Sequence, residues 1–88
     1  MYAGYSKAEI VSRGRAIYEQ KLKARIGEQN VGKWLMIDVD SEDYDVDDDA
    51  LSASGRLRER HPGAALYAMK IGEAVPIRIG ARFARGKL

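Results

Sequence analysis

Hydrophobic residues near the start of the chain recur every three or four positions, which is the spacing of one face of an α-helix. They are Ile10, Val11, Ile17, Tyr18, Leu22 and Ile26. Ser6 stands before this pattern with Glu9 three residues later, as in a helix-capping box, and Gly27 follows the pattern. The sequence therefore predicts an N-terminal helix over residues 6–27.

The hydrophobic period becomes two in the next segment, KWLMIDVD, as expected for a β-strand. Two sets of side chains would point to opposite sides of this strand: Leu35, Ile37 and Val39 against Trp34, Met36 and Asp38. The polar residues of DSED then favour a turn, and YDV alternates again, with Tyr44 and Val46 on one side. The sequence predicts a β-hairpin here.

A second helical pattern follows the hairpin. One face of this helix would hold Ala50, Leu51, Ser54, Leu57 and Arg58. The sequence HPG at positions 61–63 comes next, and Pro and Gly are residues that end helices. Beyond it, AALYAMKI and VPIRI have the character of two more strands, joined by the short polar loop GEA.

The expected order of elements is therefore α-β-β-α-β-β. This order predicts an α+β fold in two layers, with a small antiparallel sheet and both helices packed on one face of it. The 88 residues form one domain, 1–88. It comprises the N-terminal helix 6–27, a hairpin-helix-hairpin core over 33–80 and a basic tail over 81–88.

Composition places the chain among folded globular proteins, because 45% of its residues are hydrophobic and 32% are charged. It has no cysteine, so disulfides cannot compensate for the small core of so short a chain. Self-association is another way to bury more surface, and we expect a homodimer. The sequence has neither a membrane-length apolar run nor a signal-peptide pattern at its start, so we expect a cytoplasmic protein without a membrane partner.

Charge is distributed very unevenly. The segment from Asp38 to Asp49, DVDSEDYDVDDD, contains eight acidic residues and no basic one. It does not match a calcium-binding EF-hand loop, because no register places Gly at the sixth position and Glu at the twelfth. It also lies between a predicted strand and a predicted helix, whereas an EF-hand loop joins two helices.

Three interpretations of the acidic segment remain. In the first, Asp38 and Asp40 occupy the solvent-facing end of a strand, Asp47 caps the second helix, and Asp48 and Asp49 lie in its first turn. In the second, the segment is a surface for a basic partner, for which the candidate residues are Asp43, Asp45, Asp47 and Asp48. In the third, it is a weak site for divalent ions.

Catalytic chemistry has little support in the sequence. His61 is the only histidine, so neither a two-histidine metal site nor a histidine relay can form within one chain. Its position favours a structural role at the C-terminus of the second helix. The phosphate-binding GxxxxGK[ST] and the nucleophile motif GxSxG are both missing. We therefore expect no catalytic residue, no metal site and no cofactor, and a protein that is not an enzyme.

Nucleic-acid binding is an alternative. The last predicted strand and the tail carry basic residues around one aromatic residue, a composition suited to phosphate contacts and base stacking. The candidate residues are Arg78, Arg82, Phe83, Arg85 and Lys87. No helix-turn-helix or aromatic RNA-binding strand motif accompanies them.

The segments RGRAIYEQKLKARI, GKWLMIDVDSEDYDVDDD and RLRERHPGAALYAMKIG, in this order, resemble a family of small uncharacterised bacterial proteins that is largely cyanobacterial. The resemblance covers about residues 13–80. Genes of this family often stand beside a toxin gene or a gene for a retropepsin-like aspartic protease. The resemblance therefore implies an antitoxin-like or adaptor role, and it brings no catalytic residues. The tail GARFARGKL is longer than the ends typical of the family.

From the residues and the resemblance together, we expect a non-enzymatic protein-interaction module. Its expected partners are a second copy of itself and a co-encoded protein. The alternative is a small nucleic-acid-binding regulator that uses the basic tail.

Overall fold

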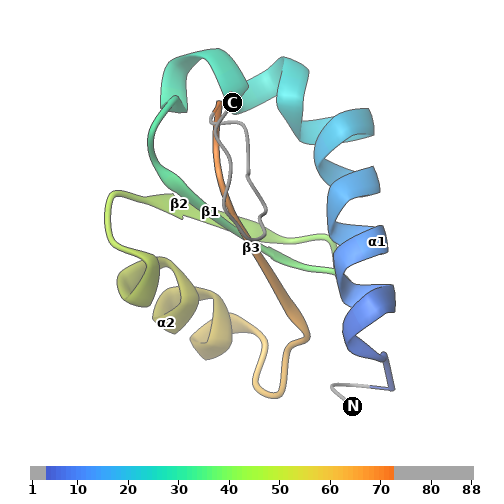
Figure 1. Ribbon diagram of the computed structural model, residues 1–88. Helices are drawn as coiled ribbons and strands as arrows, with labels where there is room; N and C mark the ends of the chain where they lie inside the picture. Colours follow the sequence, from blue (N-terminus) through green and yellow to red (C-terminus); the bar gives the residue numbers. More distant parts are fainter. Residues whose placement is uncertain (1–3, 73–88) are drawn as a thin grey trace, which may run out of the picture.

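The computed structural model describes residues 4–72, in which two helical segments flank a three-stranded antiparallel sheet (Figure 1). The helices are α1 (Lys7–Ile17), continued by the π-helical segment η1 (Tyr18–Gly27) and the 3-10 turn η2 (Glu28–Asn30), and α2 (Ala50–Arg60). The strands are β1 (Trp34–Asp38), β2 (Tyr44–Asp47) and β3 (Leu66–Lys70). The α+β class is confirmed. The strand expected at 75–79 and the tail 81–88 lie outside the described residues.

The predicted capping box at the start of α1 is confirmed. The Glu9 backbone N–H donates to the Ser6 hydroxyl at 3.2 Å, and the Ser6 N–H donates to the Glu9 carboxylate at 2.8 Å. Gly27 does not end the helical path, because it keeps right-handed helical angles and the chain continues to Asn30. There Asn30 Nδ2 donates to the Ile26 carbonyl at 2.8 Å, and Gly32, with φ 88°, turns the chain into β1.

The strand order is β2-β1-β3, with β1 in the centre. Leu35 of β1 lies between Val46 of β2 and Met69 of β3. The predicted hairpin is confirmed as β1–β2, and the segment AALYAMKI supplies β3. Because β1 is the central strand, its two hydrogen-bonding sides are both occupied, whereas β2 and β3 each have one outer edge within the described sheet.

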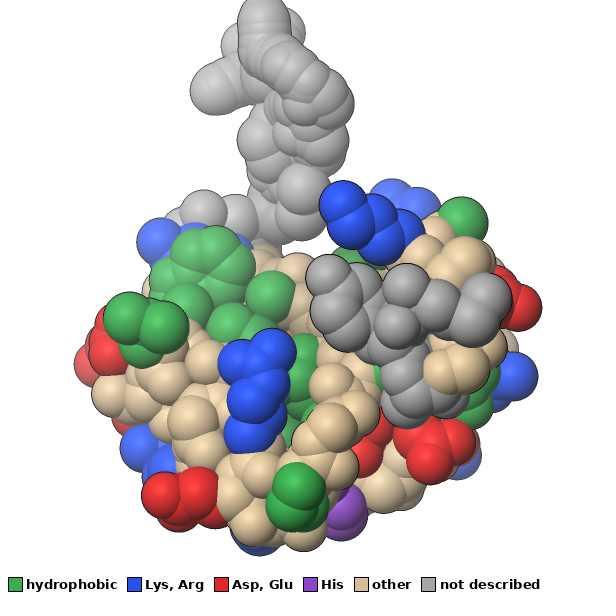
Figure 2. All heavy atoms as spheres, turned by 90° about the horizontal axis from the view of Figure 1, so that it is seen from below, with side chains coloured by type: hydrophobic (Ala, Val, Ile, Leu, Met, Phe, Trp, Pro, Cys, Tyr) green, Lys and Arg blue, Asp and Glu red, His purple; other side chains and the backbone are tan. Residues whose placement is uncertain are grey.

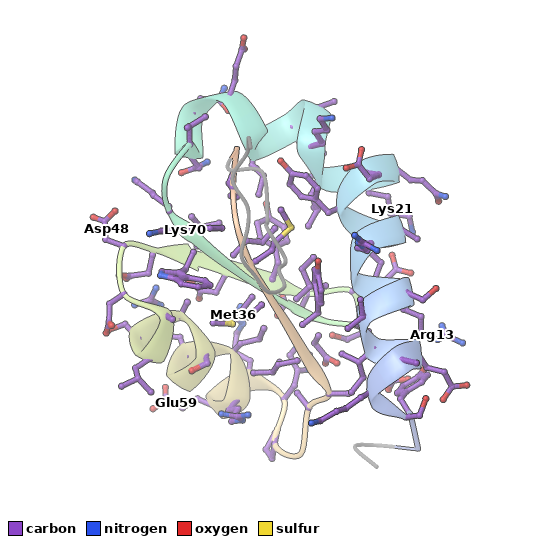
Figure 3. The ribbon with its side chains drawn as sticks, in the orientation of Figure 1. Arg13, Lys21, Met36, Asp48, Glu59 and Lys70 are labelled. Carbon is purple, nitrogen blue, oxygen red and sulfur yellow. The ribbon has the colours of Figure 1, made fainter. Side chains whose placement is uncertain are left out.

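The expectation that both helices pack on one face of the sheet is wrong, since α1 and α2 cover opposite faces (Figure 1). Leu35, Ile37 and Val39 join the core cluster beneath α1 and η1. Met36 points to the other face, toward α2 (Figure 3). The sequence of β1 explains this arrangement, because its residues Trp34 to Ile37 form an unbroken apolar run, as in strands that are covered on both faces. Leu35 to Asp38 are all buried.

The second core cluster also corrects the predicted inner face of α2. Ala53 and Leu57 are fully buried against Met36, with Ala50 packed beside them. Leu51, expected on the inner face, is 80% exposed. Positions 50, 53 and 57 keep helical spacing, so the sheet contacts a face that is rotated from the predicted one.

No helix in the described part of the chain is both long and apolar enough to cross a membrane.

Candidate functional site: the two edges of the sheet

Two arginines of α2 bind the acidic residues of β2 and Asp43, which directly precedes it. Arg56 donates to Asp45 at 2.7 Å and to Asp47 at 2.9 Å. Arg60 donates to Asp43 at 2.9 Å and to Asp45 at 3.2 Å. The two arginines stand four residues apart, so they project from one face of α2 over the strand that precedes it.

The other acidic residues of the turn reach the N-terminal part of the chain. Asp40 accepts a hydrogen bond from the Tyr5 hydroxyl at 2.9 Å, and Glu42 forms an ion pair with Lys21. Glu42 has φ 68°, in the left-handed region that tight turns use. The charge of the acidic segment is therefore compensated in part from two sides, by the arginines of α2 and by Lys21 of η1.

Asp38 is buried, with 3% of its surface exposed, and does not occupy a solvent-facing strand end as predicted. Its carboxylate accepts from the Asp40 N–H at 3.1 Å and from the Ser41 hydroxyl at 2.8 Å, which closes the turn after β1. His61 lies at the C-terminus of α2, as predicted, and its Nε2 is 2.9 Å from Asp43 Oδ2. These contacts link the end of α2 to the hairpin turn.

The N-cap of α2 is Asp49 and not Asp47. The Asp49 carboxylate accepts from the Ser52 N–H at 3.2 Å and from the Ser52 hydroxyl at 2.8 Å. Asp47 is still the last residue of β2, where it pairs with Trp34 and accepts from the Asp49 N–H at 2.8 Å. The helix begins two residues later than expected because β2 extends that far along β1.

The predicted partner-binding residues are thus only partly brought together. Asp43, Asp45 and Asp47 gather around Arg56 and Arg60. Asp48 is exposed and points away from the sheet (Figure 3).

Electrostatics keep these carboxylates ionised. The Arg60 guanidinium holds the pKa of Asp43 at about 2, with further help from hydrogen bonds to His61 and to the Tyr44 N–H. Arg56 lowers the pKa of Asp45. Within residues 4–72 no group of three or more His, Asp or Glu side chains is arranged to hold a metal ion. The arrangement stabilises a fold, and its carboxylates do not have the raised pKa of a general acid.

We expect Asp43→Asn to lower the free energy of unfolding at pH 6 by about 1 kcal/mol, a modest amount because solvent screens this partly exposed ion pair. The native-state pKa lies below the ordinary value of 3.8, so the stabilisation is present above about pH 4 and is lost as pH falls through about 2. Urea unfolding should therefore show the difference from the wild-type protein shrinking toward pH 2. Asp48→Asn is the control with no expected change. A difference that is constant with pH would contradict the proposed ion pair.

The outer edge of β2 is covered by the same two arginines. The Asp38 N–H donates to the Asp43 carbonyl at 2.9 Å. The backbone N–H and C=O groups of the odd-numbered residues of β2 therefore point toward β1, and those of the even-numbered residues point outward. The outward carbonyls of Tyr44 and Val46 accept from Arg60 at 3.0 Å and from Arg56 at 3.4 Å. Side chains of α2 thus occupy backbone acceptors that another strand would need.

The outer edge of β3 differs. The Val39 N–H donates to the Ala65 carbonyl at 3.1 Å, and the Ile71 N–H donates to the Lys33 carbonyl at 2.9 Å. The backbone N–H and C=O groups of the odd-numbered residues of this strand therefore point toward β1. The backbone groups of the even positions, Leu66, Ala68 and Lys70, therefore face away from the sheet. None of these groups forms a hydrogen bond with another residue in the range 4–72.

A groove of about 450 Å³ runs along β3, between α1 and the end of α2. Its apolar lining comes from α1, from the loop after α2 and from β3: Ile10, Val11, Ala64, Leu66 and Ala68. Val11 is 43% exposed, although it belongs to the predicted apolar face of α1. The face of the molecule that is seen from below shows hydrophobic side chains at the surface beside Lys and Arg (Figure 2).

Two cations also line this groove: Lys7 from the first turn of α1 and Arg58 from the last turn of α2. Neither forms a salt bridge with a described residue, and no described carboxylate lines the groove. Sequence reasoning did not identify Lys7 as a site residue, and it placed Arg58 on the inner face of α2. The two residues are far apart in the sequence, and only the folded arrangement of α1, α2 and β3 places them at the same groove.

The alternative nucleic-acid-binding residues, Arg78, Arg82, Phe83, Arg85 and Lys87, lie outside the described residues. Nucleic-acid binding by the tail stays a prediction.

Comparison with known protein families, with curated proteins and with solved structures found no match. The family resemblance therefore stays an expectation, and the geometry of the two sheet edges carries the functional proposal.

Proposed function

We propose that the protein is a non-enzymatic interaction module, antitoxin-like or an adaptor, that binds a co-encoded protein by adding an extended segment of that partner to β3. The observation that supports this proposal is the difference between the two sheet edges. The edge of β2 has its outward carbonyls bound by Arg56 and Arg60, whereas the outward backbone groups of β3 are unpaired within residues 4–72, and Leu66 and Ala68 line a mainly apolar groove.

Unpaired strand edges are sites of association, and natural proteins commonly protect them with charged side chains or covering elements. The β2 edge has such protection, and its ion pairs involve three of the eight acidic residues of the segment, Asp43, Asp45 and Asp47. An added strand on β3 would gain backbone hydrogen bonds from Leu66, Ala68 and Lys70 and would bury apolar surface of the groove. Binding by strand addition therefore uses groups that residues 4–72 leave unpaired, and it competes with the strand predicted at 75–79 for the same edge.

The acidic hairpin has a structural role in this proposal. Asp43, Asp45 and Asp47 are each bound by an arginine, so a basic partner would compete with contacts that already exist. We therefore place the main contact at β3 and not at these three carboxylates.

The test is Ala68→Pro in full-length tagged protein that is co-expressed with the product of its neighbouring gene. Proline removes an outward N–H of β3 and leaves the hydrogen bonds to β1 intact, because position 68 does not face β1. We expect co-purification to be lost in Ala68→Pro and kept in Ala68→Thr, the control that retains the N–H. Equal co-purification of both variants would contradict the proposal.

Hydrogen exchange of the free full-length protein gives a second measurement that needs no variant to fold. The amides of Leu66, Ala68 and Lys70 should exchange rapidly, while those of Met69 and Ile71 should be protected by β1. Protected amides at 66, 68 and 70 would mean that another part of the chain or a second copy already occupies the edge. Concentration dependence of that protection would identify the second copy.

A further inference from the structure

We infer that the segment bound at β3 is acidic as well as apolar, with Asp or Glu side chains placed between Lys7 and Arg58. This inference rests on the proposed function. It adds the chemistry by which the groove would select its partner.

The charge of the groove is the first argument. Lys7 approaches from the α1 side and Arg58 from the α2 side, and no described carboxylate lies between them. Both side chains are exposed, whereas Arg56 and Arg60 on the same helix are paired with aspartates. The groove therefore has a local positive potential, which attracts an acidic segment and repels a basic one.

The geometry of an added strand is the second argument. Successive side chains of such a strand alternate between the two faces of the sheet, so one set would meet Ile10 and Val11 and the other Leu66 and Ala68. A carboxylate on either set has a cation within the same groove, because one cation lines each side. The expected ligand is an extended apolar segment with at least one acidic residue.

A second copy of this chain is disfavoured as the occupant, because like charges would meet. Antiparallel pairing of two β3 strands about Ala68 would place Lys70 of one copy opposite Leu66 of the other. Lys70 lies on the α2 side of the sheet, over the ring of Trp34 at 5.5 Å (Figure 3). Its charge would approach Arg58 of the other copy, so like charges would meet. The homodimer expected from the sequence gains no support at this edge.

The test uses a phage-displayed library of linear peptides of about eight residues, the length of an ordinary strand. The library is selected on full-length wild-type protein and on Lys7→Glu/Arg58→Glu. We expect peptides selected on the wild-type protein to be apolar and enriched in Asp and Glu. Peptides selected on the double variant should instead be enriched in Lys and Arg.

Binding of one selected acidic peptide then gives the magnitude. The double charge reversal should weaken binding on the order of 100-fold at low salt, mainly by slowing association, and the effect should shrink at about 1 M salt. Lys23→Glu/Arg25→Glu is the control with the same change in net charge away from the groove, and it should leave binding nearly unchanged.

The remaining outcomes separate the two proposals. Selected peptides that lose binding in Ala68→Pro but show no acidic enrichment would overturn this inference and leave strand addition intact. Peptides that are indifferent to Ala68→Pro, or a selection that enriches none, would overturn strand addition and this inference with it. Protection of the β3 edge in the free protein would overturn the acidic partner. It would assign the edge to a second copy if the protection depends on concentration, and to the chain's own predicted strand at 75–79 if it does not.

Discussion

Replacing Gly14 with alanine is expected to lower the free energy of unfolding by about 1–3 kcal/mol. A β-carbon at position 14 would lie 2.2 Å from Cγ of Tyr67 and 2.5 Å from its Cβ, so rotation of the Tyr67 ring cannot relieve the overlap. Helix α1 would have to move away from β3. The loss is a large share of the stability of a small domain, roughly 0.05–0.15 kcal/mol per residue, and urea unfolding measures it.

Gly55→Ala is the matched control, because Gly55 is also in a helix and a β-carbon there would contact nothing within 4 Å. Alanine is the better helix former, so this change should stabilise the protein by up to about 1 kcal/mol. In the double variant Gly14→Ala/Tyr67→Gly, removal of both the ring and its β-carbon should make the loss smaller than the sum of the single losses. Two glycine variants of equal stability would show that α1 does not lie against β3 at this point.

The sequence contained signals for much of the fold. The capping box of Ser6 and Glu9, the hairpin and the end of α2 before Pro62 and Gly63 all depend on neighbouring residues, and each is in place. Gly14 stood within an apolar helical face, and such a glycine is a sign of close backbone approach. The four consecutive large apolar residues Trp34 to Ile37 were the available sign that both faces of β1 are covered.

Other features depend on contacts that no local pattern contains. Asp49 caps α2 because pairing with β1 keeps Asp47 in the strand, and that register is fixed by the fold. The pairing of β3 with β1 decides that the backbone groups of Ala68, and not those of Met69, point outward. The groove requires the convergence of Lys7, Arg58 and β3, three parts of the chain that are far apart in the sequence.

Leu57→Ala is expected to lower the free energy of unfolding by about 2–5 kcal/mol, because the removed atoms leave a cavity beneath α2. Leu57 has no exposed surface and packs with Met36 and Ala53. The matched change Leu51→Ala removes the same atoms from a residue that is 80% exposed, and it should alter stability by no more than about 0.5 kcal/mol.

This pair of variants distinguishes the observed orientation of α2 from the one that the sequence predicted. In the predicted orientation Leu51 and Leu57 share the inner face, so both substitutions would cost a similar amount. In the structure only Leu57 reaches Met36 on the face of β1 opposite α1. Chemical denaturation of the two variants measures the difference directly. Equal losses would mean that α2 presents another face to the sheet. Arg56 and Arg60 would then not protect the edge of β2, and Arg58 would not lie at the groove beside β3.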